Sequence, residues 1–337
     1  MSVHRDWTPE DPRKAFFPVT VRPAFWMDAR DKQHYIPGQK VLVDAERDYP
    51  LAVVSERYHL ITNEEAYRMA DVIVRGVFGG YTLGDFQCYN IMMPSTRSSC
   101  RMDFIIPHNQ FSAFGDRRES YTPFLRISNS YNRTLVLRYE IGFCRWICLN
   151  GCIFGKKSYT ATFVHSLQKK QRSVYDAIAE ARRTIGSIED LWADMERKLT
   201  VLSGITVPFE SALPVFCQVF GVPDVDKEEV SLSVAEKHVA RAEHFLEQGR
   251  SYYGDLGPNA YALFNTLTDF ASFPDGRSMT GTAVHGYQRK VGDWVDGLVA
   301  AAGARDFVFD ETITNTARTS AKALQRRMAK ETVLVQR

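Results

Sequence analysis

The chain has 337 residues, of which 45% are hydrophobic and 24% are charged, and 42 Lys and Arg against 40 Asp and Glu give a formal net charge of +2. These values are typical of a globular protein and exclude a collagen-like, a low-complexity or a highly charged disordered chain. No stretch approaches the ~20 apolar residues of a membrane-spanning helix, and no basic start leads into an apolar run, so we expect a cytoplasmic protein without membrane contact. Its six cysteines are expected to be reduced thiols, because disulfide frameworks belong mainly to small secreted domains.

Residues 1–34 are expected to form an extended N-terminal arm. Four prolines, Pro9, Pro12, Pro18 and Pro23, exclude a helix interior or a central strand from most of this segment. The aromatic residues Phe16, Phe17, Phe25 and Trp26 predict that the arm packs on its own domain or on a neighbouring subunit. Packing on its own domain is the favoured alternative, because apolar arms usually cover the edge of a core.

Residues 35–165 are predicted to form a β-rich core domain that contains one helix. Pro37 and Gly38 predict a turn, and short alternating segments predict strands at 40–44, 51–55 and 58–62, followed later by a hairpin of 85–93 with 100–107. Between them, Thr62 or Asn63 can cap a helix that ends at Gly79-Gly80.

Two more strands are expected at 124–128 and 134–141, joined by the polar turn SNSYNR. In the second of these, period two places Leu135, Leu137 and Tyr139 on one face and Arg138 on the other. Arg138 therefore points outward if the leucine face is core.

Residues 166–337 are predicted to form a helical region that packs on this core. Helices are expected near 171–184, 188–202, 234–247, 259–271, 284–301 and 314–330. The predicted fold class is therefore α+β, with an antiparallel sheet and one helix in the N-terminal half and a mostly α-helical C-terminal half.

Positive charge and aromatic rings are concentrated between Tyr121 and Tyr175. The only acid there is Glu140, and it accompanies Arg126, Arg133, Arg138, Arg145, Lys156, Lys157, Lys169, Lys170 and Arg172. A surface that only has to be soluble normally mixes both signs of charge. Cations with interleaved rings suit a polyanion with exposed bases, and the lack of a helix-turn-helix, zinc-finger or basic-zipper pattern favours single strands over duplex.

The candidate nucleic-acid-binding residues of this basic-aromatic stretch fall into two groups. Phosphates would be held by Arg126, Arg133, Arg138, Arg145, Lys156 and Lys157, and bases would stack on Tyr131, Tyr139 or Tyr159, where an exposed ring contributes ~1–3 kcal/mol per base. The alternative is that the rings are core residues and the arginines lie on the solvent face of a sheet, as is common.

No motif in the sequence specifies a reaction, so we expect neither a cofactor nor enzymatic activity. Cys144, Cys148 and Cys152 recur at a spacing of four, but structural zinc normally takes a closely spaced CxxC-like pair, so they are interpreted as buried thiols and no metal is expected. Phosphate-loop, dinucleotide and nucleophile-elbow motifs are also lacking.

Two segments, VVSERYHLITNEEAYRMADVI and ISNSYNRTLVLRYEIGFCRWICLNGCIFG, resemble the signature segments of the phage/plasmid-like protein family, whose domain has no known function. The resemblance rests on Ser55, Tyr58, Asn63 and Glu65 in the first segment and on Asn129, Ser130, Tyr131, Asn132, Arg145, Cys148 and Asn150 in the second. It extends over roughly residues 40–300. Asn132 stands where an acid is expected, which argues against a metal-binding carboxylate there.

The resemblance implies a protein of a phage or plasmid that works near recombination or replication. Together with the basic-aromatic stretch, it leads us to expect a non-catalytic, oligomeric protein that binds single-stranded DNA or RNA and that serves strand annealing in recombination. The alternative is an interaction protein, such as an inhibitor of host restriction or defence, with a host or phage protein as its partner. An enzyme acting on nucleic acid would need three or more acids beside the basic stretch.

Overall fold

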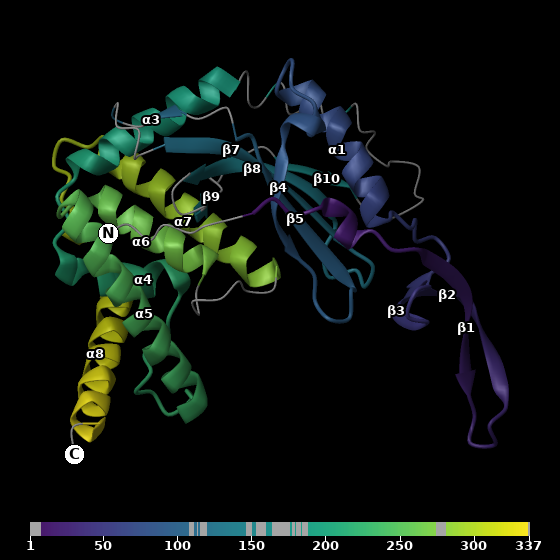
Figure 1. Cartoon of the computed structure of the whole chain (residues 1–337). Coiled ribbons are helices and arrows are strands. Elements are labelled where there is room, and N and C mark those ends of the chain that lie inside the picture. Colours follow the sequence, from purple (N-terminus) through teal and green to yellow (C-terminus); the bar gives the residue numbers. More distant parts are fainter. Residues whose placement is uncertain are drawn as a thin grey trace.

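The computed structural model describes residues 8–107, 111–112, 114, 120–145, 150–152, 160–163, 176, 179, 183, 188–273 and 281–335. It has three parts: a projecting β arm, a central sheet with one long helix beside it, and a group of packed helices (Figure 1). Antiparallel sheets lie in the N-terminal half and most helices in the C-terminal half. The predicted α+β class is therefore confirmed.

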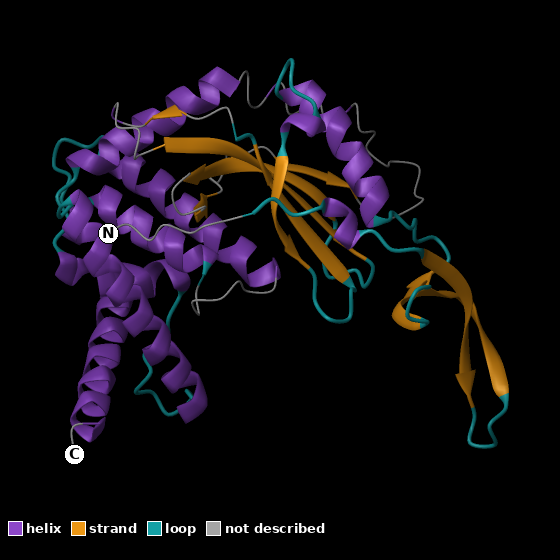
Figure 2. Ribbon diagram, in the orientation of Figure 1, coloured by secondary structure: helices purple, strands orange, loops and turns teal. Residues whose placement is uncertain are grey.

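The arm follows a short 3-10 helix, η1 (Pro12–Ala15), and is a three-stranded antiparallel sheet of β1 (Val19–Met27), β2 (Gln33–Asp44) and β3 (Tyr49–Ser55) in the order β1-β2-β3. Figure 2 shows the β1–β2 ribbon extending away from the helices. Pro23 and Pro50 lie in the two edge strands, where a missing N–H is tolerated. Pro37 and Gly38, predicted to form a turn, lie instead within β2, where Gly38 has a φ of 71°.

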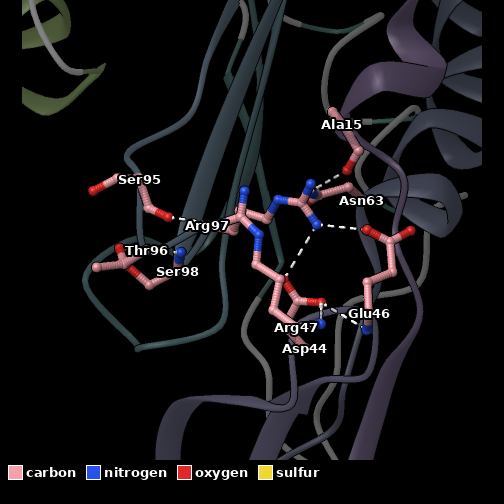
Figure 3. Close-up of polar contacts among 9 residues, drawn as sticks. All are labelled: Ala15, Asp44, Glu46, Arg47, Asn63, Ser95, Thr96, Arg97 and Ser98. Carbon is pink, nitrogen blue, oxygen red and sulfur yellow. Dashed lines mark hydrogen bonds and ion pairs between the residues drawn. The ribbon is translucent and has the colours of Figure 1, made fainter.

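The arm is fixed at its base to the turn between β4 and β5 of the central sheet (Figure 3). Arg97 Nη1 lies 2.7 Å from Glu46 Oε2 and 3.2 Å from Asp44 Oδ2, and its guanidinium is 4.9 Å from the centre of the Phe17 ring. Arg47 Nη1 donates to the Ser95 carbonyl at 2.8 Å. Because Asp44 is buried, these contacts lie partly out of solvent and hold the arm base and the sheet together.

The central sheet has the strand order β10-β8-β7-β5-β4, and β6 and β9 pair with β7 and β8. Its strands are β4 (Gln87–Met92), β5 (Ser99–Ile105), β6 (Phe111–Ser112), β7 (Ser120–Ser130), β8 (Leu137–Arg145), β9 (Asn150–Cys152) and β10 (Thr160–Phe163). The predicted hairpins β4–β5 and β7–β8 are confirmed. The strand predicted at 58–62 is wrong, because this segment has no strand pairing. Instead, the Tyr58 hydroxyl donates to the Ser130 carbonyl, and Thr62 is the N-cap of the helix that follows.

That helix is α1 (Asn63–Val77), and it begins as predicted. Thr62 Oγ1 accepts from the Glu65 N–H at 3.1 Å while the Thr62 N–H donates to Glu65 Oε2 at 2.7 Å, which forms a capping box. Its buried face packs against the sheet residues Met102, Phe104, Leu125, Ile127, Tyr139 and Ile141. A short 3-10 helix, η2 (Leu83–Asp85), leads from α1 to β4.

The helical part contains α3 (Ile188–Gly204), α4 (Ala212–Phe220), α5 (Leu232–Leu256), α6 (Ala260–Ser272), α7 (Gly281–Ala301) and α8 (Asn315–Val335), with 3-10 turns η5 (Phe209–Ser211) and η6 (Phe309–Thr312). The helices predicted from 188 onward are confirmed, and the one near 171–184 lies mostly outside the described residues. The sequence did not predict α4, whose run ALPVFCQVF is too apolar to show a helical period and contains Pro214 in its first turn. Within the described ranges, no helix has the length and hydrophobicity to cross a membrane.

Candidate functional site

Two adjacent rows of polar residues cross the central sheet on the face opposite α1. The first row is formed by the cross-strand neighbours Asp103 of β5, Arg126 of β7 and Glu140 of β8, and the second by Arg101, Ser128 and Arg138 of the same strands. Members of the two rows are two residues apart on each strand, so they share one face. The arginines of the basic-aromatic stretch thus meet acids in three dimensions.

Arg126 connects this face to the helices. Its Nε and Nη2 donate to the two carboxylate oxygens of Asp103 at 2.6 and 2.7 Å, and its Nη1 donates to Gln288 Oε1 of α7 at 2.5 Å. Gln288 Nε2 in turn donates to Ser272 Oγ of α6 at 3.2 Å. Burial opposes the charge, but Asp103 raises the pKa of Arg126 above its ordinary value. Arg126 is therefore a charged residue that links the sheet to α7 through hydrogen bonds.

Arg101 is in a different situation. Its Nε donates to Ser128 Oγ at 3.3 Å, and its Nη1 is buried without a hydrogen-bond partner among the described residues. Burial, with a further contribution from the charge of Arg126, lowers the pKa of Arg101 to about 9. The sheet face thus contains one guanidinium whose charge is poorly compensated.

Two further residues of the stretch connect the sheet to the helices. The Arg145 guanidinium lies 5.7 Å from the centre of the Tyr252 ring of α5, and the hydroxyl oxygens of Tyr121 and Tyr261 of α6 are 2.8 Å apart. All four side chains are buried. This end of the sheet is therefore part of an internal contact with the helical part.

Five of the residues on which the family resemblance rests lie in one buried network: Tyr58, Asn63, Asn129, Ser130 and Tyr131. The Asn63 N–H donates to the Tyr131 hydroxyl at 3.0 Å, and Asn129 Nδ2 donates to Asn63 Oδ1 and to the Ile61 carbonyl at 3.0 Å each. The Tyr58 hydroxyl donates to the Ser130 carbonyl at 3.1 Å. These contacts join the start of α1 to the end of β7.

The predicted nucleic-acid-binding residues do not form one surface. Arg126, Tyr131, Tyr139 and Arg145 are at most 3% exposed, Arg133 is exposed in the β7–β8 turn, and the Arg138 side chain is 28% exposed and lies 3.8 Å from Glu140. Lys156, Lys157 and Tyr159 lie outside the described residues. The assignment of the first four to nucleic acid needs correction, because both faces of the sheet are covered and these side chains have internal partners. Tyr139, for instance, donates its hydroxyl proton to the Ala66 carbonyl at 2.7 Å.

Sequence reasoning missed Asp103 and Gln288. Asp103 could have been noticed, because Arg101 and Asp103 alternate with apolar residues in CRMDFIIP and so mark a polar stripe on a strand. Gln288 gives no such signal, since one Gln in a helix is ordinary. The interpretation of Cys144 as a buried thiol is confirmed, whereas the side chains of Cys148 and Cys152 are not among those described.

The described residues contain no group of three or more His, Cys, Asp or Glu residues that could hold a metal ion. The rows provide two carboxylates, Asp103 and Glu140, among three guanidiniums. Their charge suits an anion better than a cation.

Comparison with known proteins places the chain in a family. No curated protein matches it, and neither does any solved structure. The family described as Domain of unknown function (DUF932) matches residues 50–273, a range that includes both segments of the resemblance, the central sheet and the helices through α6. This match covers more than half of the chain, and the chain therefore belongs to the DUF932 family.

Proposed function

We propose that this protein binds single-stranded DNA or RNA without catalysing a reaction on it. The observation that carries the proposal is the charge of residues 153–187, where Lys156, Lys157, Lys169, Lys170, Arg172, Arg182 and Arg183 accompany only Asp176 and Glu180. The rings of Phe154, Tyr159, Phe163 and Tyr175 are interleaved with these cations. Interleaved cations and rings suit a strand whose phosphates and bases are both accessible.

Because arginines of the sheet are buried, we place the proposed interface on other cations. Arg126 is engaged by Asp103 and Gln288, so it contributes to folding and not to a surface. Arg133 in the β7–β8 turn and the rim residue Arg138 are the cations of that hairpin with access to solvent. We assign phosphate contacts to these two and to the cations of 153–187.

The biological setting of the proposal rests on the family resemblance. It implies a phage or plasmid protein that works near recombination, and strand annealing by a cytoplasmic homo-oligomer is the activity we propose. Annealing needs two strands held with their bases free to pair, which contacts to phosphates allow.

Fluorescence anisotropy of labelled single-stranded and double-stranded oligonucleotides, measured at several salt concentrations, tests the proposal. Lys156→Ala with Lys157→Ala should reduce the steepness of log K against log salt by about 1.4, because each phosphate contact on a single strand contributes about 0.7. The matched control is Lys227→Ala with Lys237→Ala, two exposed cations of the helical part, which should leave the slope unchanged. Absence of single-strand binding at low salt, or an equal loss in both variants, contradicts the proposal.

A second function, contact with another protein, is favoured by the arm. Phe25, Trp26, Met27 and Tyr35 near its tip are about half exposed, between 46% and 56%. Its cations Arg22, Arg30, Lys32, Lys40 and Arg47 are matched in number by Asp28, Asp31, Asp44, Glu46 and Asp48.

A neutral apolar ribbon gives no long-range attraction to a polyanion, but it suits a protein surface. The partner we propose is a second copy of the chain. The alternative is a host or phage protein, as expected of an inhibitor of restriction or defence.

A further inference from the structure

The second polar row of the sheet has the composition of an anion site. Arg101, Ser128 and Arg138 are direct cross-strand neighbours on β5, β7 and β8, so a hydroxyl lies between two guanidiniums. Neighbouring strands are about 4.8 Å apart, so the backbones of Arg101 and Arg138 lie about 10 Å apart across β7, and two long arginine side chains can reach one small ligand from that separation. Arg101 already donates its Nε proton to Ser128 Oγ, and this contact fixes the two side chains relative to each other.

The charges of the two rows are not balanced. Asp103 is fully used by the paired hydrogen bonds from Arg126, and Glu140 Oε1 has Arg138 Nη1 at 3.8 Å. Arg101 is 2% exposed and its buried Nη1 lacks an acceptor among the described residues. A buried guanidinium that lacks an acceptor for one of its nitrogens destabilises a fold, so an anion that accepts from Nη1 would stabilise the structure.

We propose that the Arg101–Ser128–Arg138 row binds a phosphate group, with Arg101 Nη1 and the Ser128 hydroxyl as buried donors and Arg138 at the entrance. Arginine donates in a planar fork that matches phosphate oxygens, and a phosphate supplies enough acceptors for both guanidiniums and the hydroxyl. The partly exposed Arg138 side chain connects the buried donors to solvent. This site shares Arg138 with the proposed strand interface, but its buried donors Arg101 and Ser128 and the cations of 153–187 belong to one site each.

The phosphate group could belong to inorganic phosphate, to a mononucleotide or to the end of a nucleic-acid strand. The chemistry of recognition is the same in each case, since each presents terminal phosphate oxygens. Separate titrations with inorganic phosphate, with AMP, and with a 5′-phosphorylated oligonucleotide against its 5′-hydroxyl form identify which source the site accepts.

Thermal unfolding with increasing phosphate, at ionic strength kept constant with chloride, tests the site. Ligand at about 100 times its Kd should raise the Tm of the wild type by about 4 °C. Arg101→Met, which keeps much of the side-chain volume without the charge, should abolish this shift and leave the Tm without phosphate unchanged or higher. Arg250→Met, which removes an exposed cation of α5, should keep the full shift.

The proposal is overturned if none of the phosphate ligands shifts the Tm more than chloride does, or if Arg101→Met retains the wild-type shift. Should Arg101→Met fail to fold, Ser128→Ala replaces it, and an unchanged affinity for phosphate in that variant is equally contradictory. The Lys156→Ala and Lys157→Ala variant separates this inference from the proposed strand binding, because it should retain the phosphate shift while losing affinity for oligonucleotides.

Discussion

The ion pair between Asp103 and Arg126 provides the sharpest test of the buried charges. Asp103→Asn keeps the shape of the side chain but removes the charge that faces Arg126 at 2.6 and 2.7 Å. Both partners are almost fully buried, and breaking such a pair typically costs about 3–5 kcal/mol, because the remaining charge is left uncompensated. We therefore expect the free energy of unfolding to fall by about 3–5 kcal/mol.

A surface pair of equal length serves as the control. Arg68 Nη2 lies 2.6 Å from Glu64 Oε1 on α1, but both side chains are largely exposed, and such helical pairs contribute only about 0.3–0.5 kcal/mol. Urea unfolding followed by circular dichroism should show a large decrease for Asp103→Asn and almost none for Glu64→Gln.

The double variant Asp103→Leu with Arg126→Met tests the cause of this loss. It removes both charges, so it should be more stable than Asp103→Asn. A cost below about 1 kcal/mol for Asp103→Asn, similar to that of Glu64→Gln, would refute the argument that burial makes this pair important.

Three further predictions follow from other parts of the molecule. Thr62→Ala removes the capping box of α1 and should lower the free energy of unfolding by about 1 kcal/mol in a urea titration, whereas no change would show that tertiary packing alone fixes the helix start. Burial raises the pKa of Cys88, Cys100 and Cys217 to about 12, so these thiols should react with DTNB at pH 8 far more slowly in the folded than in the urea-unfolded protein. Because the folded state keeps thiol protons that the unfolded state loses above about pH 9, their contribution to stability should decrease as pH rises from 9 to 12. Phe25→Ser with Trp26→Ser replaces exposed rings, so it should change the free energy of unfolding by less than about 0.5 kcal/mol but reduce self-association in light scattering, and an unchanged mass distribution would argue against contact between copies through the arm.

The elements that the sequence predicted well are those with local signals. Thr62 and Glu65 cap α1 whatever surrounds it, and the β4–β5 and β7–β8 hairpins follow from alternation and polar turns. The arm was predicted less well, because prolines indicate that a segment is not a central strand without indicating that it pairs as an edge. Helix α4 was missed for a different reason, because an all-apolar run shows no periodicity that distinguishes a helix from a strand.

The candidate site was the least predictable part. Alternation correctly separated Tyr139 from Arg138 on β8, yet it could not show that helices cover the polar face or that Asp103 would lie opposite Arg126. Counted along the chain, the stretch has nine cations and one acid, whereas across the two rows of the sheet three guanidiniums lie beside two carboxylates. The pairing of β5 with β7 places Asp103 beside Arg126, and no local sequence pattern encodes that pairing.

The arm has a consequence for how copies of this chain could be spaced. Nine residues of β1 extend about 30 Å at about 3.4 Å per residue, and the Arg97 contacts fix the lower end of this length to the sheet. A partner bound at Trp26 is thus held about one β1 length from the central sheet. In an assembly built through such contacts, the globular bodies would be separated by the length of the arm.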